Sequence, residues 1–156
     1  MDDKYYDGLA QDLEMGLICY VHRTTKEYIS MPDFSEFSDN QELYQEDIDK
    51  IEANPDDYVE MRPMESRKSF LIMVDFAEQE VRNRFWQSKL IDALERSKPF
   101  RRFKDIVDTY DALREQWFTY KHTRYTEWVK EKLEWALSED NSEQSFLLLS
   151  FFFVSK

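Results

Sequence analysis

The sequence predicts a predominantly helical α+β fold, in which a small antiparallel sheet packs against a C-terminal helical bundle. Three observations lead to this prediction. Two β-favouring runs near the N-terminus are joined by a short polar connection, a third run ends at Pro63, and from Ser66 onward apolar residues recur at helical spacing. The 156 residues suffice for one domain with a sizeable core and leave little room for a second.

The first predicted element is a short helix that ends near Met15. Gly16 follows at the position where a C-terminal cap is expected. We expect one face of this helix to lie in the core. Four apolar side chains have the spacing of such a face: Tyr6, Leu9, Ala10 and Leu13.

The next segment is predicted to form a hairpin. Residues 17–22 and 27–31 favour strands, and the polar residues 23–26 are few enough to connect them as antiparallel neighbours. Pro32 ends the second strand because its nitrogen cannot donate a ladder hydrogen bond. A third strand is predicted over 57–62, so the sheet consists of the N-terminal hairpin and one further strand.

An acidic loop over 33–40 leads to a second predicted helix. Ser38 and Gln41 have the spacing of a capping box. The helix ends at Asn54, because a residue that precedes a proline leaves the helical region. Its expected apolar face consists of Tyr44, Ile48 and Ile51.

The C-terminal half is predicted to be helical. Pro99 suits the first turn of one helix, where its missing N–H is unbonded anyway. The last helix spans 111–138 and carries too many aromatic rings for one stripe, so we expect it to break near residues 121–123. The apolar faces expected in the helices before it are Phe70, Met73, Val74 and Ala77; Trp86, Leu90, Ala93 and Leu94; and Phe100, Phe103, Val107 and Tyr110.

We expect a single domain over 1–156, with an acidic hairpin and strand part (1–63), a helical part (64–138) and an apolar tail (139–156). Residues 145–154 are almost entirely apolar, too short to span a bilayer, and an aggregation hazard in water. The tail should therefore be covered, either by its own domain or in a homodimer.

The formal net charge of −12 is unevenly distributed. Residues 1–80 hold 7 Lys and Arg against 21 Asp and Glu, whereas residues 81–138 hold 13 against 9. A protein this acidic is repelled by nucleic acid at long range, which disfavours non-specific binding to the phosphate backbone. A nucleic acid would have to bind the mildly basic 81–138 half.

The composition argues against several classes of site. Two glycines in the whole chain rule out glycine-rich phosphate loops, and one cysteine with two histidines argues against a metal site. We expect no cofactor and no catalytic residue, with Cys19 as a packed thiol, His22 at a strand end and His122 on the surface. The N-terminus lacks a signal-peptide pattern and no run approaches the ~18 apolar residues of a membrane helix, so the expected location is the cytoplasm.

The densest unusual feature is a basic segment over 96–104, which interleaves five cations with Phe100 and Phe103. If both rings anchor a helix inward, its arginines are free to meet an anionic group. The alternatives are ordinary ion pairs between residues four apart, or docking of this segment against the acidic first half. The candidate residues for binding an anion or a partner are Arg101, Arg102, Lys104, Lys121 and Arg124.

Two segments resemble a known family. Residues 93–105 read Ala-Leu-Glu-Arg-Ser-Lys-Pro-Phe-Arg-Arg-Phe-Lys-Asp, and 113–118 read Leu-Arg-Glu-Gln-Trp-Phe. They are similar to the Phe-Arg-Arg-Phe-Lys-Asp block and the later Arg-x-x-Trp-Phe motif of the bacterial uncharacterised protein family 0158. Residues 54–58 also look similar to a stretch of that family, whereas residues 97–99 replace the glycine and small residues that usually precede its block. The resemblance covers about 15–138, implies no activity, and marks out Phe100, Arg101, Arg102, Phe103, Lys104, Asp105, Trp117 and Phe118.

Three functions remain open. The first is a non-enzymatic interaction or regulatory module with an unidentified protein partner, whose contact surfaces are the basic helical face and the acidic loop at 33–47. The second is a nucleic-acid-binding protein that uses the helices of 81–138, where Trp117 and Phe118 could form a stacking platform if they are not core. The third is an enzyme with an unidentified carboxylate- or histidine-based site. The lack of a cofactor or nucleophile motif favours the first.

Overall fold

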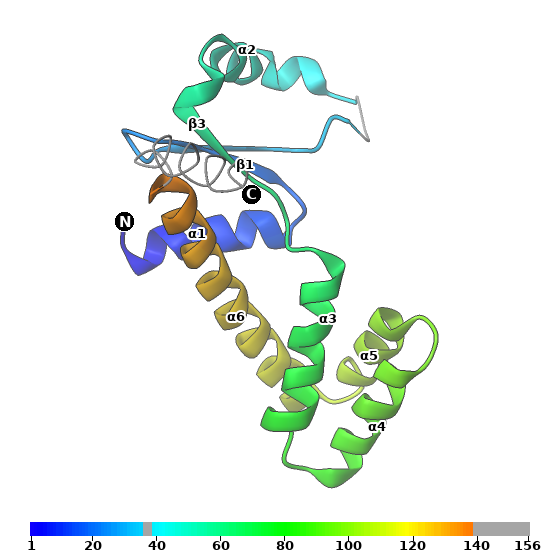
Figure 1. Cartoon of the computed structure of the whole chain (residues 1–156). Coiled ribbons are helices and arrows are strands. Elements are labelled where there is room, and N and C mark those ends of the chain that lie inside the picture. The colour runs from blue at the N-terminus through cyan, green and yellow to red at the C-terminus, as the bar shows by residue number, and fades with distance from the viewer. Residues whose placement is uncertain (36–38, 139–156) are drawn as a thin grey trace, which may run out of the picture. The chain divides into compact units, whose positions relative to one another are not determined.

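A computed structural model describes residues 1–35 and 39–138, and it confirms a predominantly helical α+β fold with one three-stranded antiparallel sheet (Figure 1). The expected tail lies outside the described residues. The helices are α1 (Asp3–Glu14), α2 (Gln45–Ala53), α3 (Ser66–Asp75), α4 (Arg84–Glu95), α5 (Pro99–Val107) and α6 (Asp111–Ser138), with short 3₁₀ helices η1 (Gln41–Tyr44) and η2 (Pro55–Asp57) and a π-helix η3 (Phe76–Glu80); the strands are β1 (Ile18–His22), β2 (Tyr28–Met31) and β3 (Tyr58–Met61).

The chain groups into two compact units. The sheet unit consists of Met1–Pro63 and the described residues from Glu127 on, and the helical unit consists of Met64–Thr126. Helix α6 supplies residues to both. The single-domain organisation over 1–156 stays a prediction. In the described part of the chain, no helix combines the length and the apolar content that crossing a bilayer requires.

The sheet has the strand order β2-β1-β3, and both neighbours run antiparallel to β1, which confirms the expected hairpin and third strand. Cys19 lies opposite Ser30 of β2 and Met61 of β3. Cys19 and Val21 are buried on the face that α1 covers, where Ser30 donates a hydrogen bond to Asp12 of that helix over 2.6 Å. Figure 1 shows α2 over the opposite face of the sheet.

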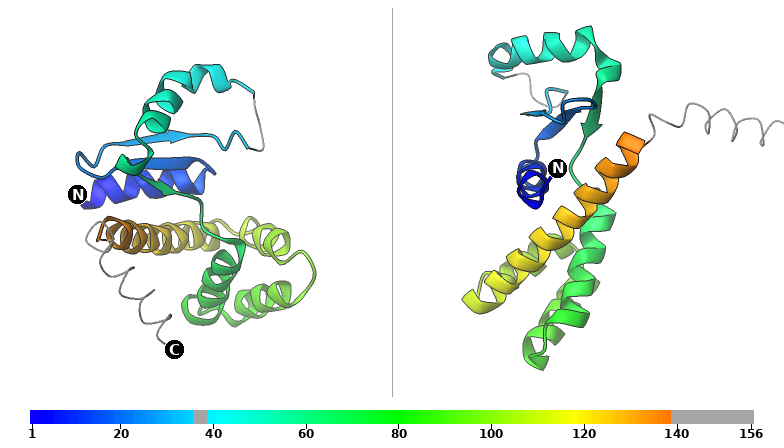
Figure 2. Two further views of the ribbon diagram at one scale, coloured as in Figure 1. Left: turned by 45° about the horizontal axis from the view of Figure 1, so that its top comes forward. Right: turned by 90° about the vertical axis from the view of Figure 1, so that its left-hand side faces the viewer.

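Helix α1 begins and ends as its sequence indicates. The Asp2 carboxylate accepts a hydrogen bond from the N–H of Tyr5, and all four residues of the expected apolar face are buried. Gly16 has a φ of 90°, which lets the N–H of Leu17 bond to the carbonyl of Asp12 over 3.1 Å. The C-terminal turns of α6 run beside α1, where Lys130 lies 5.7 Å from the ring centroid of Tyr6 (Figure 2).

Helix α2 matches its predicted end but buries less than expected. It stops at Ala53, just before Asn54 and Pro55. Ser38, the expected cap, lies outside the described residues. The side chains of the expected apolar face are only half-buried: Tyr44, Ile48 and Ile51.

Phe76 is the centre of the core of the helical unit. Its ring centroid lies 6.2 Å from that of Phe103, 5.1 Å from that of Trp117 and 5.4 Å from that of Tyr120. Phe76 was not among the core residues expected from the sequence. Of the expected face, Met73 and Ala77 are buried, whereas Phe70 and Val74 are only half-buried. The buried side chains of this segment are Ile72, Met73, Phe76 and Ala77.

Only half of the expected apolar face of α5 is buried. Phe103 and Val107 are each 1% exposed, whereas Phe100 is 44% and Tyr110 48% exposed. The expectation that both phenylalanines anchor the helix inward is therefore wrong for Phe100, whose ring rests against that of Phe70 at 6.3 Å. Tyr110 is not part of the buried face because α5 ends at Val107, so the helical spacing of that face does not extend to residue 110.

The predicted break near residues 121–123 is wrong, because α6 is one continuous helix of 28 residues. Thr123 and Thr126 donate hydrogen bonds back to the carbonyls of Thr119 and His122, as in an unbroken helix. The aromatic crowding has another cause: Phe118 and Trp135 are exposed and lie off the buried stripe. That stripe includes Leu113, Trp117, Tyr125, Val129 and Leu133.

We predict that Phe103→Ala lowers the free energy of unfolding by about 3–5 kcal/mol, because it removes a fully buried ring between Phe76 and Trp117. Phe100→Ala is the matched control from the same helix. Its ring is 44% exposed, so it should cost clearly less. Urea denaturation of both variants measures the difference, and equal costs would contradict the burial described for α5.

Candidate functional site

Arg124, one of the five expected binding cations, is held in an internal network. Its Nη1 donates to Oδ2 of Asp75 over 3.1 Å and to the Tyr120 hydroxyl over 2.6 Å. The Arg124 side chain is about one-third exposed. These contacts join α6 to α3, so the position of Arg124 is fixed by packing, and Lys121 nearby is half-buried.

The cations of α5 are exposed. Arg101, Arg102 and Lys104 all point away from the side of α5 that buries Phe103. Nε of Arg102 donates to the carbonyl of Ser97 over 2.7 Å, which ties the side chain to the turn before the helix. Among the described residues, Arg101 and Lys104 lie in no ion pair with the carboxylates four positions on. The role of the five cations in binding an anion stays a prediction.

A different set of residues forms a continuous surface feature in the helical unit. We call it the aromatic–cation strip. Its first four members, an ammonium group and three aromatic rings, contact one another in turn through their side chains. The last two, a guanidinium group and a fourth ring, contact each other and are joined to the third ring only through the backbone, where the N–H of Arg114 donates to the carbonyl of Tyr110 over 3.0 Å. The members in order are Lys89, Phe85, Trp86, Tyr110, Arg114 and Phe118.

The first half of the strip comes from the start of α4. Nζ of Lys89 lies 5.0 Å from the ring centroid of Phe85, one helical turn earlier. The Phe85 ring meets that of Trp86 edge to face at 5.1 Å. Trp86 then stacks on Tyr110 with the planes only 4° apart and the centroids 5.6 Å apart. This stack joins α4 to the residue that immediately precedes α6.

The second half follows the first turns of α6. Arg114 and Phe118 are four residues apart, so they share one side of α6. Tyr110 immediately precedes the helix, and its carbonyl accepts a hydrogen bond from the N–H of Arg114 over 3.0 Å. The guanidinium carbon of Arg114 lies 5.4 Å from the ring centroid of Phe118. Nε of Arg114 is also 3.5 Å from Oδ1 of Asp108, which fixes its direction.

The strip is accessible to a binding partner. Phe85 is 60%, Tyr110 48% and Phe118 46% exposed, and both cations are exposed. Exposed aromatic rings that touch one another are uncommon on a surface that faces only water, and they mark interaction sites. The strip can offer flat π faces to an apolar or planar group, and two cations to an anionic one.

Only part of this site is predictable from the residue pattern that suggested a stacking platform. Trp117 and Phe118 were expected to act as a pair, but Trp117 is buried against Phe76 and Phe103, and Phe118 alone is on the strip. Trp86 and Tyr110 were expected on core faces, but Trp86 is half-buried and Tyr110 is exposed. A usable signal was present, because aromatic and cationic residues alternate four apart at 110, 114 and 118.

Two potential reactive groups of the sheet unit are held in structural roles. Cys19 is buried, burial raises the pKa of its thiol to about 11, and its Sγ lies 3.3 Å from Oγ of Ser30. Nδ1 of His22 accepts hydrogen bonds from the N–H groups of Thr24 and Thr25, each at 3.1 Å. His22 thus stabilises the hairpin turn. Among the described residues, no cluster of ligating side chains could hold a metal ion.

Comparison with known proteins identifies the family. Residues 34–150 match the model of the Uncharacterised protein family (UPF0158). The chain belongs to this family. A UPF0158 protein of Pseudomonas aeruginosa is 32% identical over 94 residues, which make up 60% of this chain and 58% of that relative, so the match covers less than two thirds of the relative's length. No solved structure matches the chain. The resemblance found in the sequence is confirmed, and the family has no assigned function that could be transferred to the strip.

We predict that iodoacetamide alkylates Cys19 of the folded protein slowly at pH 8. A pKa of about 11 leaves roughly 100-fold less thiolate than a pKa near 9 does. The rate should rise as the pH approaches 11, and protein unfolded in urea should react fast at pH 8. Rapid alkylation of the folded chain at pH 8 would contradict the buried, neutral thiol. Mass spectrometry of the modified peptide measures the rate.

Proposed function

We propose that this chain is a non-enzymatic binding module whose aromatic–cation strip is its contact surface for another protein. Two exposed sets of contacts carry this proposal: Lys89, Phe85, Trp86 and Tyr110 in turn, and Arg114 with Phe118 on the adjoining turns of α6. Protein interfaces are enriched in aromatic residues and arginine, and the residues with most of the binding energy are Trp, Tyr and Arg. The strip contains one of each.

The rigidity of the strip also favours binding. Trp86 and Tyr110 hold each other in a parallel stack, and Arg114 is directed by Asp108, so these side chains lose little freedom when a partner covers them. The helical unit carries 13 Lys and Arg against 10 Asp and Glu. The partner surface should therefore present an apolar or aromatic anchor for the rings, with carboxylates toward Lys89 and Arg114.

The structural roles of Cys19 and His22 support a binding function over catalysis. A thiol with a pKa near 11 is a poor nucleophile at neutral pH. The lone pair that His22 would need at Nδ1 as a base is occupied by two backbone N–H groups. Both residues serve the hairpin and the sheet.

Nucleic acid is the second candidate partner, and the Trp86–Tyr110 stack favours it. Stacked, exposed rings beside cations are the means by which proteins bind single strands without sequence preference. The net charge of −12 opposes this partner at long range. Binding to a single strand would weaken steeply with salt, whereas an anchor of aromatic rings in a protein pocket would depend on salt only weakly.

We predict that the double variant Phe85→Ser/Phe118→Ser loses the proteins that the wild-type chain retains from a nuclease-treated lysate, with recovery reduced about tenfold or more. Leu71→Ser is the matched control, since Leu71 is also exposed in the helical unit but lies off the strip. Quantitative mass spectrometry of the retained proteins measures recovery. Equal recovery by the wild type and the double variant would overturn the proposal.

The cations of α5 require their own experiment. Arg101→Glu/Arg102→Glu reverses two exposed charges outside the strip, and we expect it to leave retention of the strip's partners nearly unchanged. A fluorescent single-stranded oligonucleotide at low and moderate salt tests the second candidate with the same variant. Salt-sensitive binding that both the charge reversal and Phe118→Ser abolish would favour nucleic acid over a protein partner.

A further inference from the structure

The outer edge of strand β2 is free to form hydrogen bonds. In the hairpin, the N–H of His22 bonds to the carbonyl of Glu27 over 2.8 Å, so alternate residues after Glu27 face β1. Ile29 and Met31 therefore point their backbone groups toward β1, and Tyr28 and Ser30 point theirs outward. Among the described residues, no backbone partner occupies the outward N–H and C=O groups of Tyr28 and Ser30.

The two edges of the sheet differ in how they are protected. Natural proteins guard an open edge with charges, prolines or bulges. Strand β3 carries Glu60, which forms an ion pair with Arg62 at 2.8 Å, and Arg62 also reaches Asp33. Strand β2 reads Tyr-Ile-Ser-Met and has no charged residue. The β2 edge is thus the one that remains open to a further strand.

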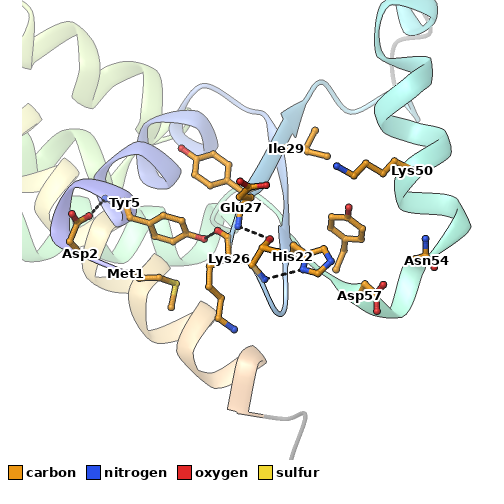
Figure 3. A pocket seen from close by; sticks show the side chains of 13 residues that line it. Met1, Asp2, Tyr5, His22, Lys26, Glu27, Ile29, Lys50, Asn54 and Asp57 are labelled. Carbon is orange, nitrogen blue, oxygen red and sulfur yellow. Dashed lines mark hydrogen bonds between the residues drawn. The ribbon is translucent and has the colours of Figure 1, made fainter.

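A groove of about 1070 Å³ lies at the hairpin-turn end of this edge, where Tyr28 and Ile29 line it, and it has walls on both faces of the sheet (Figure 3). Tyr5 and Asp2 of the α1 side line one wall. Ile29 and Lys50 line the other, on the side of α2. Successive side chains of an added strand point to opposite faces, so each wall would receive alternate residues of that strand.

The α1 wall is preformed. The Tyr5 hydroxyl donates a hydrogen bond to the carbonyl of Lys26 over 2.7 Å, and its ring meets that of Tyr28 edge to face at 5.6 Å. A Cβ added at Gly8 would lie 2.9 Å from the Tyr28 hydroxyl, so glycine leaves the room that this ring occupies. On the other wall, the Tyr58 ring is held edge to face by His22 at 5.1 Å.

The charge around the groove selects the occupant. Residues 1–63 of the sheet unit hold 17 Asp and Glu against 5 Lys and Arg. Three carboxylates line the groove, those of Asp2, Glu27 and Asp57. Two lysines also line it: Lys50, and Lys26, whose Nζ donates a hydrogen bond to the carbonyl of Arg23. A basic segment with apolar or aromatic residues at alternate positions fits both this charge and the ring-lined walls.

We propose that the β2 edge binds an extended basic peptide of a partner protein as a fourth antiparallel or parallel strand. The outward backbone groups of Tyr28 and Ser30 supply the main-chain hydrogen bonds, and the two walls read alternate side chains. This site lies in the sheet unit and does not rest on the aromatic–cation strip, so it can fail or hold independently of the proposed function.

Selection of displayed random peptides against the full chain supplies the probe. We expect the selected peptides to be rich in Lys and Arg with apolar residues at alternate positions. Amide hydrogen exchange of the chain with a synthetic selected peptide should slow at Tyr28 and Ser30 and stay unchanged at Glu60 on the opposite edge. N-methylation of alternate peptide nitrogens should weaken binding about tenfold, since it removes ladder hydrogen bonds.

Ile29→Lys and Glu60→Lys form a matched pair of edge variants. Ile29→Lys places a cation in the groove and should weaken the basic peptide about tenfold, whereas Glu60→Lys should change its affinity little. Four results would overturn the proposal. The first two are failure to select any binder and selection of acidic peptides. The third is protection from exchange at Glu60 or at the strip instead of β2, and the fourth is protection of β2 that depends on protein concentration in the absence of peptide. The last result would assign the edge to a second copy of the chain. If Ile29→Lys does not fold, the exchange and N-methylation results decide alone.

Discussion

The helical unit depends on the packing of Phe76 against Phe103, Trp117 and Tyr120. These rings come from η3, α5 and α6, so a single aromatic cluster fixes three segments that are far apart in sequence. The π-turn that carries Phe76 leaves carbonyls that a regular helix would bond, and Nε2 of Gln87 donates to those of Ala77 and Glu78. The burial of Phe76 and the hydrogen bonds from Gln87 to these carbonyls thus both stabilise the π-helical turn.

The same cluster determines what remains on the surface. Once Phe103 is buried, the arginines of α5 must face solvent, because a nine-residue helix has one side in the core. Once Trp117 is buried, its neighbour Phe118 turns about 100° away on α6 and joins Tyr110 and Arg114. The exposure of the strip is therefore a geometric consequence of which side chains the core buries.

The sheet unit is governed by a different constraint, the odd–even alternation of an antiparallel ladder. Three strands leave two edges, and the register decides which backbone groups each edge exposes. At β3 the exposed edge carries an ion pair, and at β2 it carries uncharged residues beside a groove. A small sheet with one charged edge and one open edge can receive a further strand at the open edge. Cys19 and Val21, buried on the face that α1 covers, stabilise the sheet.

The sequence by itself determined the elements whose signals are local. The spacing of Tyr6 and Leu13, the cap at Gly16, the hairpin connection and the start of α5 at Pro99 all depend on residues within a few positions of one another. Only the tertiary structure decided which aromatic rings are buried, because an exposed Phe100 and a buried Phe103 have the same chemistry and differ only in what lies opposite them. The continuity of α6 and the Trp86–Tyr110 stack were decided in the same way, by contacts between residues distant in the chain.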